Sequence, residues 1–162
     1  MKNLVNLLQQ AIDFNYKCGN KVPEYGTLDY WRALENQSGL MVEESSEGVD
    51  AARMNDPVES VDALADELFV IAWKIEMLQK SGFDVEGSLQ AVIDSNAKKV
   101  FNSFYEACAA KEQIEMVKDD ECFVETSVYN GLPFYTVRRQ SDNKIMKAVD
   151  FVPVDLEEYI PK

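Results

Sequence analysis

Three glutamates in one short segment are the residues of this sequence best suited to do chemistry. Glu43, Glu44 and Glu47 stand in the run Glu-Glu-Ser-Ser-Glu. At about 100° per residue, this spacing places all three within about 100° of arc on one face of an α-helix. Leu40 and Ala51 share that face and are core-type residues. We therefore expect the glutamates to point toward the interior of a helical bundle.

A second acidic stripe follows on the next expected helix. Asp62 and Asp66 lie one turn apart, and Phe69 and Trp73 continue the stripe with apolar side chains. Carboxylates on an apolar stripe are costly unless they are paired or bind a cation. Few basic residues stand nearby in the sequence, and hard oxygen ligands suit magnesium or manganese.

The segment Asn55-Asp56-Pro57 predicts a tight turn between the two acidic helices. A helical hairpin would bring the two stripes face to face, where their repulsion would destabilise the fold without a metal. The alternative is that both stripes are solvated faces of acidic helices. On spacing alone we favour a metal site built from these carboxylates over the solvated alternative.

The composition limits the class of protein. The chain has 162 residues, 46% of them apolar, and 16 Lys and Arg against 29 Asp and Glu give a net charge of −13. This charge argues against binding nucleic acid polymers, but a small phosphorylated ligand is allowed, because bound metal ions invert the local charge. The absence of histidine excludes Ser-His-Asp and Cys-His catalysis and histidine-ligated zinc.

Cysteine usage and hydropathy indicate the compartment. The sequence has an odd number of cysteines, and their spacing fits neither a metal site nor a redox motif; they are Cys18, Cys108 and Cys122. No apolar run approaches the roughly 20 residues that span a bilayer, and the N-terminus has no signal-peptide pattern. We expect a protein of the cytoplasm (the host cytoplasm if a phage encodes it) that does not bind membranes.

The sequence predicts a mainly α fold with a small C-terminal β-meander. Helices are expected over residues 3–17, about 28–54, about 58–80, and from about 85 into 102–110. Short connections favour an antiparallel helical bundle or an interleaved dimer of such units. Strands are expected over residues 123–129, 134–138 and 145–151, with Asn130-Gly131 as a hairpin turn. The predicted domains are residues 1–110, helical and catalytic, and residues 120–162, a β appendage.

This pattern resembles the all-α nucleoside triphosphate pyrophosphohydrolases. That superfamily includes the MazG proteins, dimeric dUTPases and phosphoribosyl-ATP pyrophosphohydrolase, and its signature is EExxE followed on the next helix by ExxD. Here EExxE is Glu43 to Glu47, and Asp66 matches the later aspartate. The ExxD glutamate would fall at Ala63. Asp62 beside it is one replacement, and the run from Glu59 to Asp62, itself an ExxD, is another.

A further segment is similar to the SNxxK motif of the phosphoribosyl-ATP pyrophosphohydrolase-like branch. It runs from Ser95 to Lys99. By that resemblance Asn96 and Lys99 contact the triphosphate; the alternative is an exposed polar helix face. The resemblance covers roughly residues 1–105 and implies a MazG-like bundle whose sites form between subunits of a homodimer or homotetramer.

The resemblance implies a magnesium-dependent hydrolase that acts on acid anhydrides. It converts a (d)NTP and water to a (d)NMP and diphosphate, in the control of nucleotide pools. By the resemblance, Glu44, Glu47 and Asp66 would hold the magnesium, with Glu43 and Asp62 assisting. Glu43 or Glu44 would act as the general base, and Phe14, Trp31 or Trp73 would pack near the nucleobase. The sequence leaves open whether dCTP, dUTP or dGTP is preferred. Two other functions also stay open: a carboxylate-metal hydrolase of another phosphorylated metabolite, and a non-enzymatic helical interaction protein that docks through its β-meander.

Overall fold

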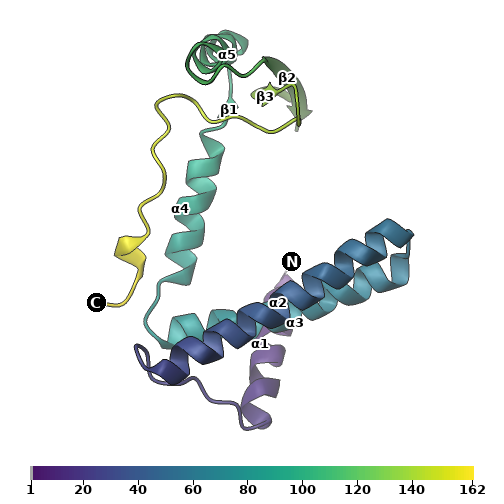
Figure 1. Cartoon of the computed structure of the whole chain (residues 1–162), viewed down its shortest axis with the longest axis vertical. Coiled ribbons are helices and arrows are strands. Elements are labelled where there is room, and N and C mark those ends of the chain that lie inside the picture. The colour runs from purple at the N-terminus through teal and green to yellow at the C-terminus, as the bar shows by residue number, and fades with distance from the viewer. Residues whose placement is uncertain (1) are drawn as a thin grey trace. The chain divides into compact units, whose positions relative to one another are not determined.

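The computed structural model describes residues 2–162, and these residues are mainly helical with one small antiparallel sheet (Figure 1). The helices are α1 (Lys2–Lys17), α2 (Leu28–Met54), α3 (Pro57–Lys80), α4 (Val85–Ala97) and α5 (Phe104–Lys118). The strands are β1 (Val100–Phe101), β2 (Cys122–Tyr129) and β3 (Leu132–Arg139), and a 3₁₀ turn, η1, covers Glu157–Tyr159. The boundaries of α1, α2 and α3 agree with the sequence prediction to within one residue.

The chain forms two compact units. Among the described residues, the first comprises residues 2–85 and 159–162, and the second comprises residues 86–158. Compact units are not the same as domains that fold independently, so the predicted domains 1–110 and 120–162 stay a prediction. The unit boundary falls at the start of α4, and the predicted end of the helical domain falls inside α5.

The first unit is built on the hairpin of α2 and α3, which lie side by side along their length (Figure 1). α1 packs against α3. Their core is small and is formed by Ala11, Ile12, Ala72, Trp73 and Met77. Helix periodicity explains the choice of α3 residues, because Ala72, Trp73 and Met77 share one face.

The second unit packs α5 against the sheet. The buried residues of α5 are Ala107, Ala110 and Ile114, at the spacing of one helical face. Ala110 and Ile114 join Cys122, Val137 and Met146 in a separate core. This unit therefore has its own hydrophobic interior.

The β2–β3 hairpin confirms the turn signal in the sequence. Asn130 and Gly131 both adopt positive φ, 51° and 78°, as a type I′ turn requires. Tyr129 pairs with Leu132 directly beside the turn, and Val128 pairs with Pro133. The hairpin register follows from this two-residue turn.

The predicted third strand over residues 145–151 is wrong, and the sheet is not a meander. The strand order is β1-β3-β2, because Val100 and Phe101 pair with Thr136 and Tyr135 on the outer edge of β3. Ile145 makes only an isolated bridge to Arg138. The expected fourth helix is likewise interrupted, since α4 ends at Ala97 and β1 precedes α5.

None of the helices within residues 2–162 combines the length and apolarity needed to cross a membrane.

Candidate functional site

The candidate site lies on the α2–α3 hairpin, whose turn is fixed by local chemistry. Asn55 ends α2 in the left-handed conformation, with φ 55°. The Asp56 side chain then caps α3 by accepting hydrogen bonds from the backbone N–H groups of Val58 (2.9 Å) and Glu59 (3.1 Å). Pro57 fills the first helical position, where its missing N–H costs nothing. This turn makes α2 and α3 antiparallel neighbours.

Polar contacts set the register between the two helices. The buried Gln37 donates to the Val70 carbonyl at 2.7 Å, and the Ser45 hydroxyl donates to Glu67 Oε1 at 2.7 Å. Between them and the turn, a Cβ placed on Gly48 would lie 3.5 Å from Ala63 Cβ. These contacts pair α2 residues 37–48 with α3 residues 63–70 and so place the two acidic stripes beside each other.

Glu44 is at the centre of the resulting acidic cluster, which we define as Glu43, Glu44, Glu47, Asp62 and Asp66. The pKa of Glu44 is raised, first by desolvation and then by the negative charges of Asp66, Glu47, Glu43 and Asp62, in that order. No described basic residue forms a salt bridge with any member of the cluster. The structure thus places Glu43, Glu47, Asp62 and Asp66 within electrostatic reach of Glu44.

The expected burial of these carboxylates is wrong for four of the five. Glu44 is half-buried, but Glu43, Glu47, Asp62 and Asp66 are exposed. Leu40, which was expected in the core, is also 45% exposed, whereas Ala51 is buried. The common helical face was predicted correctly, but most of its carboxylates are exposed rather than turned into a core.

The donor chemistry of the acidic cluster fits a hard divalent cation. Among residues 2–162, no three or more Asp, Glu, Cys or His side chains are arranged so that they could hold a metal ion. The cluster still offers only carboxylate oxygens, the preferred ligands of Mg²⁺ and Mn²⁺. A bound cation would also offset the repulsion that raises the pKa of Glu44. Glu44, Glu47, Asp62 and Asp66 are therefore candidate ligands by chemistry and neighbourhood.

The three aromatic residues predicted near the nucleobase lie in different surroundings. Trp73 is buried in the core of the first unit. Phe14 is half-exposed and packs edge-on against Phe69, with ring centroids 5.5 Å apart, and Phe69 lies within one turn of Asp66 on α3. Trp31 is 13 residues from Glu44 on α2, about 20 Å at 1.5 Å per residue. Of the three aromatics, Phe14 is the one that is both exposed and packed on a neighbour of Asp66.

Asn96 and Lys99 belong to the second unit. Asn96 lies in the last turn of α4, where its amide donates to the Val92 carbonyl at 2.9 Å. The Lys99 ammonium donates to Asn96 Oδ1. The pair is therefore locally connected, as its spacing in the sequence suggests.

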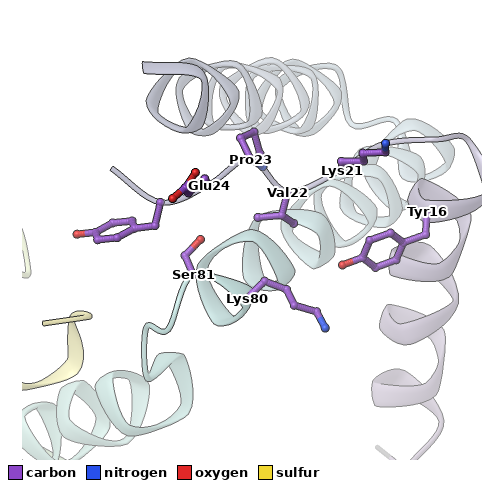
Figure 2. A pocket seen from close by; sticks show the side chains of 8 residues that line it. Tyr16, Lys21, Val22, Pro23, Glu24, Lys80 and Ser81 are labelled. Carbon is purple, nitrogen blue, oxygen red and sulfur yellow. The ribbon is translucent and has the colours of Figure 1, made fainter. Parts of the chain in front are cut away.

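A hollow of the first unit lies away from the acidic cluster. It has a volume of about 590 Å³ and is lined by Tyr16 of α1, the loop 21–25, and Lys80 and Ser81 at the end of α3 (Figure 2). Lys80 is 14 residues from Asp66, about 21 Å along α3. We place the candidate site at the acidic cluster because chemistry needs ligating or titrating groups, and none of the residues predicted to be functional lines this hollow.

Two residues of α3 that contact α2 were not predicted from the sequence. Glu67 is half-buried and accepts the hydrogen bond from Ser45, and Lys74 donates to Ser38 at 3.0 Å. Both residues lie about a quarter of a turn around α3 from Asp66, and this spacing could have identified them from the sequence.

No family, no curated protein and no solved structure matches this chain in the three comparisons. The assignment of a function therefore depends on the chemistry of the acidic cluster and on the motif resemblance.

Proposed function

We propose that this protein is a magnesium-dependent nucleoside triphosphate pyrophosphohydrolase with a MazG-like helical bundle. The observation that carries the proposal is the acidic cluster around Glu44, in which EExxE on α2 and Asp66 on α3 become neighbours. Such a concentration of unpaired carboxylates on two packed helices suits a protein that works with a bound cation.

In this proposal Glu44, Glu47, Asp62 and Asp66 hold Mg²⁺ or Mn²⁺. The ion, when bound, neutralises phosphate charge and acidifies a coordinated water. Glu44 or Glu43 accepts the proton of the attacking water, whose oxygen bonds to the α-phosphorus. The bridging oxygen between the α- and β-phosphates leaves with diphosphate.

Asn96 and Lys99 contact the triphosphate in this proposal, and Lys99 offsets charge on the departing diphosphate. Phe14 is the most suitable of the three aromatics to pack near the nucleobase, because it is accessible and close to Asp66. Trp31 would serve only if a second subunit brought it to the site.

A homo-oligomer is part of the proposal. The hairpin of α2 and α3 exposes apolar side chains that a single chain leaves in water, among them Val42, Val49, Val58, Val61 and Leu64. Exposed patches of this kind mark interaction surfaces in globular proteins.

The test is hydrolysis of a panel of dNTPs and NTPs with Mg²⁺, scored by release of diphosphate. Glu47→Ala and Asp66→Ala should each lower activity at least about a hundredfold while the helical circular dichroism is retained. Glu35→Ala is the matched control, because Glu35 is an exposed glutamate of α2, outside the acidic cluster. Full activity in both cluster variants would refute the metal assignment.

The interaction-protein alternative has one observation in its favour. The tip of the β2–β3 hairpin exposes Val128, Tyr129 and Leu132, each to 62% or more. Absence of hydrolysis across the whole panel, with a folded wild-type protein, would favour this second function. Hydrolysis of phosphorylated metabolites other than nucleotides would instead favour a related carboxylate-metal hydrolase.

A further inference from the structure

The second unit contains a basic pocket, which stands out in so acidic a chain. Its volume is about 350 Å³, within the range of small-molecule sites. Five of the chain's 16 Lys and Arg residues line it. They are Lys99, Lys118, Arg139, Lys144 and Lys147, and Asp120 is the only acidic residue that lines the pocket.

The cations of the basic pocket differ in how far they are already neutralised. Arg139 is paired with Asp142 at 2.7 Å and with Asp120 at 3.4 Å. By contrast, Lys118, Lys144 and Lys147 form no salt bridge with any carboxylate among residues 2–162. None of these three ammonium groups is held in an ion pair, although Asp142 lies near enough to Lys144 for that charge to help lower the pKa of Asp142.

The loop that presents Lys144 and Lys147 is held by hydrogen bonds. The Arg139 guanidinium donates twice to Asp142, at 2.9 and 2.7 Å, and Asp142 Oδ1 accepts from the Lys144 N–H at 3.2 Å. The backbone N–H of Arg139 donates to the Lys144 carbonyl at 3.0 Å. Lys147 Nζ lies 4.2 Å from the centre of the Phe151 ring. Such fixed backbone lowers the entropy that an incoming ligand must remove.

We propose that the basic pocket binds a phosphorylated small molecule through Lys118, Lys144 and Lys147. Lysines gathered at one hollow repel one another, and a compact anion with several charges relieves that repulsion at short range. Phosphate groups meet this description and are common partners of lysine ammonium groups. A nucleic acid polymer suits the site poorly, because the net charge of −13 repels its extended backbone.

This site goes beyond the proposed hydrolysis. None of its residues lies on α2 or α3. Lys99, which the motif resemblance places near the triphosphate, also lines the pocket, but Lys118, Lys144 and Lys147, which carry this inference, were not selected by that resemblance. Binding should therefore need neither magnesium nor the acidic cluster, and the two proposals can fail separately.

The test is isothermal titration of the full chain with inorganic tripolyphosphate in EDTA at low ionic strength. We expect saturable binding that the double variant Lys118→Ala/Lys144→Ala weakens about tenfold or more. Both side chains are exposed, so folding should be unaffected. The control is Lys17→Ala/Lys162→Ala, which removes the same charge from exposed lysines of the first unit. Glu44→Gln should bind tripolyphosphate as the wild type does.

Three results would overturn this inference. The first is no saturable binding, and the second is equal weakening by both double variants, which would show only a general charge effect. The third is tighter binding of single-stranded RNA than of tripolyphosphate, lost in Lys118→Ala/Lys144→Ala, which would assign the pocket to a polymer.

Discussion

Leucine at Gly48 should separate α2 from α3 and so test the packing that supports the acidic cluster. An added Cβ would already lie 3.5 Å from Ala63 Cβ, an ordinary van der Waals contact. Gly48→Ala should therefore stabilise the fold by about 1 kcal/mol, because glycine is a poor helix former. Gly48→Leu should instead destabilise it by about 1–3 kcal/mol, because the extra carbons overfill the space between α2 and α3.

Gly39 provides the matched control, because the same helix has open space around it. Nothing lies within 4 Å of a Cβ placed there, so Gly39→Leu should gain helix propensity without a clash. Urea unfolding followed by circular dichroism would give the free energies of unfolding of the wild type and of the three variants. Magnesium-dependent hydrolysis should also fall in Gly48→Leu but not in Gly39→Leu. Equal stability of the two leucine variants would refute close contact at Ala63, and with it the neighbourhood of the carboxylates.

Three further predictions concern charge, a hydrogen bond and assembly. The pKa of Glu44 is raised, so its charged form opposes folding at neutral pH. Glu44→Gln should therefore raise the melting temperature of the metal-free protein and reduce the stabilisation by magnesium. An unchanged melting temperature of the metal-free protein would contradict this. Tyr16 donates to Glu76 at 2.7 Å, which raises its pKa to about 12, so the bond stabilises fully below pH 10 and is lost as pH rises through 12. In urea titrations Tyr16→Phe should cost less than about 1 kcal/mol at neutral pH and clearly less at pH 12, where half of the hydroxyl groups are ionised; a cost that is unchanged at pH 12 would exclude the bond as its cause. Light scattering should give about twice the 18.4 kDa chain mass or more, and Val61→Glu should lower it, whereas a monomeric wild type would contradict assembly.

The helical hairpin was predictable because its signals are local. Thr27 caps α2 by accepting from the Tyr30 N–H at 3.2 Å, and Asn55, Asp56 and Pro57 each have one conformational role at the turn. The sheet was less predictable, since β1 is two residues long and pairs with residues more than 30 positions away. No periodicity can be read from two residues.

The membership of the acidic cluster was predictable, but its burial was not. The spacing of Glu43, Glu44 and Glu47 fixes a common helical face whatever surrounds it. Whether water covers that face depends on what packs over it, and the apolar residue Leu40 beside the glutamates proved 45% exposed. The basic pocket was harder still to predict, because Lys118 and Lys144 come together only through the packing of α5 against the sheet.

The sheet order has a consequence for the solubility of the protein. Because β1 covers β3 only at Tyr135 and Thr136, the outer edge of β3 near the hairpin tip has no partner strand among the described residues. Hydrogen-bonded and non-hydrogen-bonded residue pairs alternate along a hairpin. The pair Val128–Pro133 follows the pair Tyr129–Leu132 beside the turn, so the backbone nitrogen of Pro133 points toward that open edge. Proline carries no N–H there, which deprives a strand of another molecule of its first hydrogen-bond donor. The hairpin can thus leave Val128 and Leu132 in water while its edge resists growth into an intermolecular sheet.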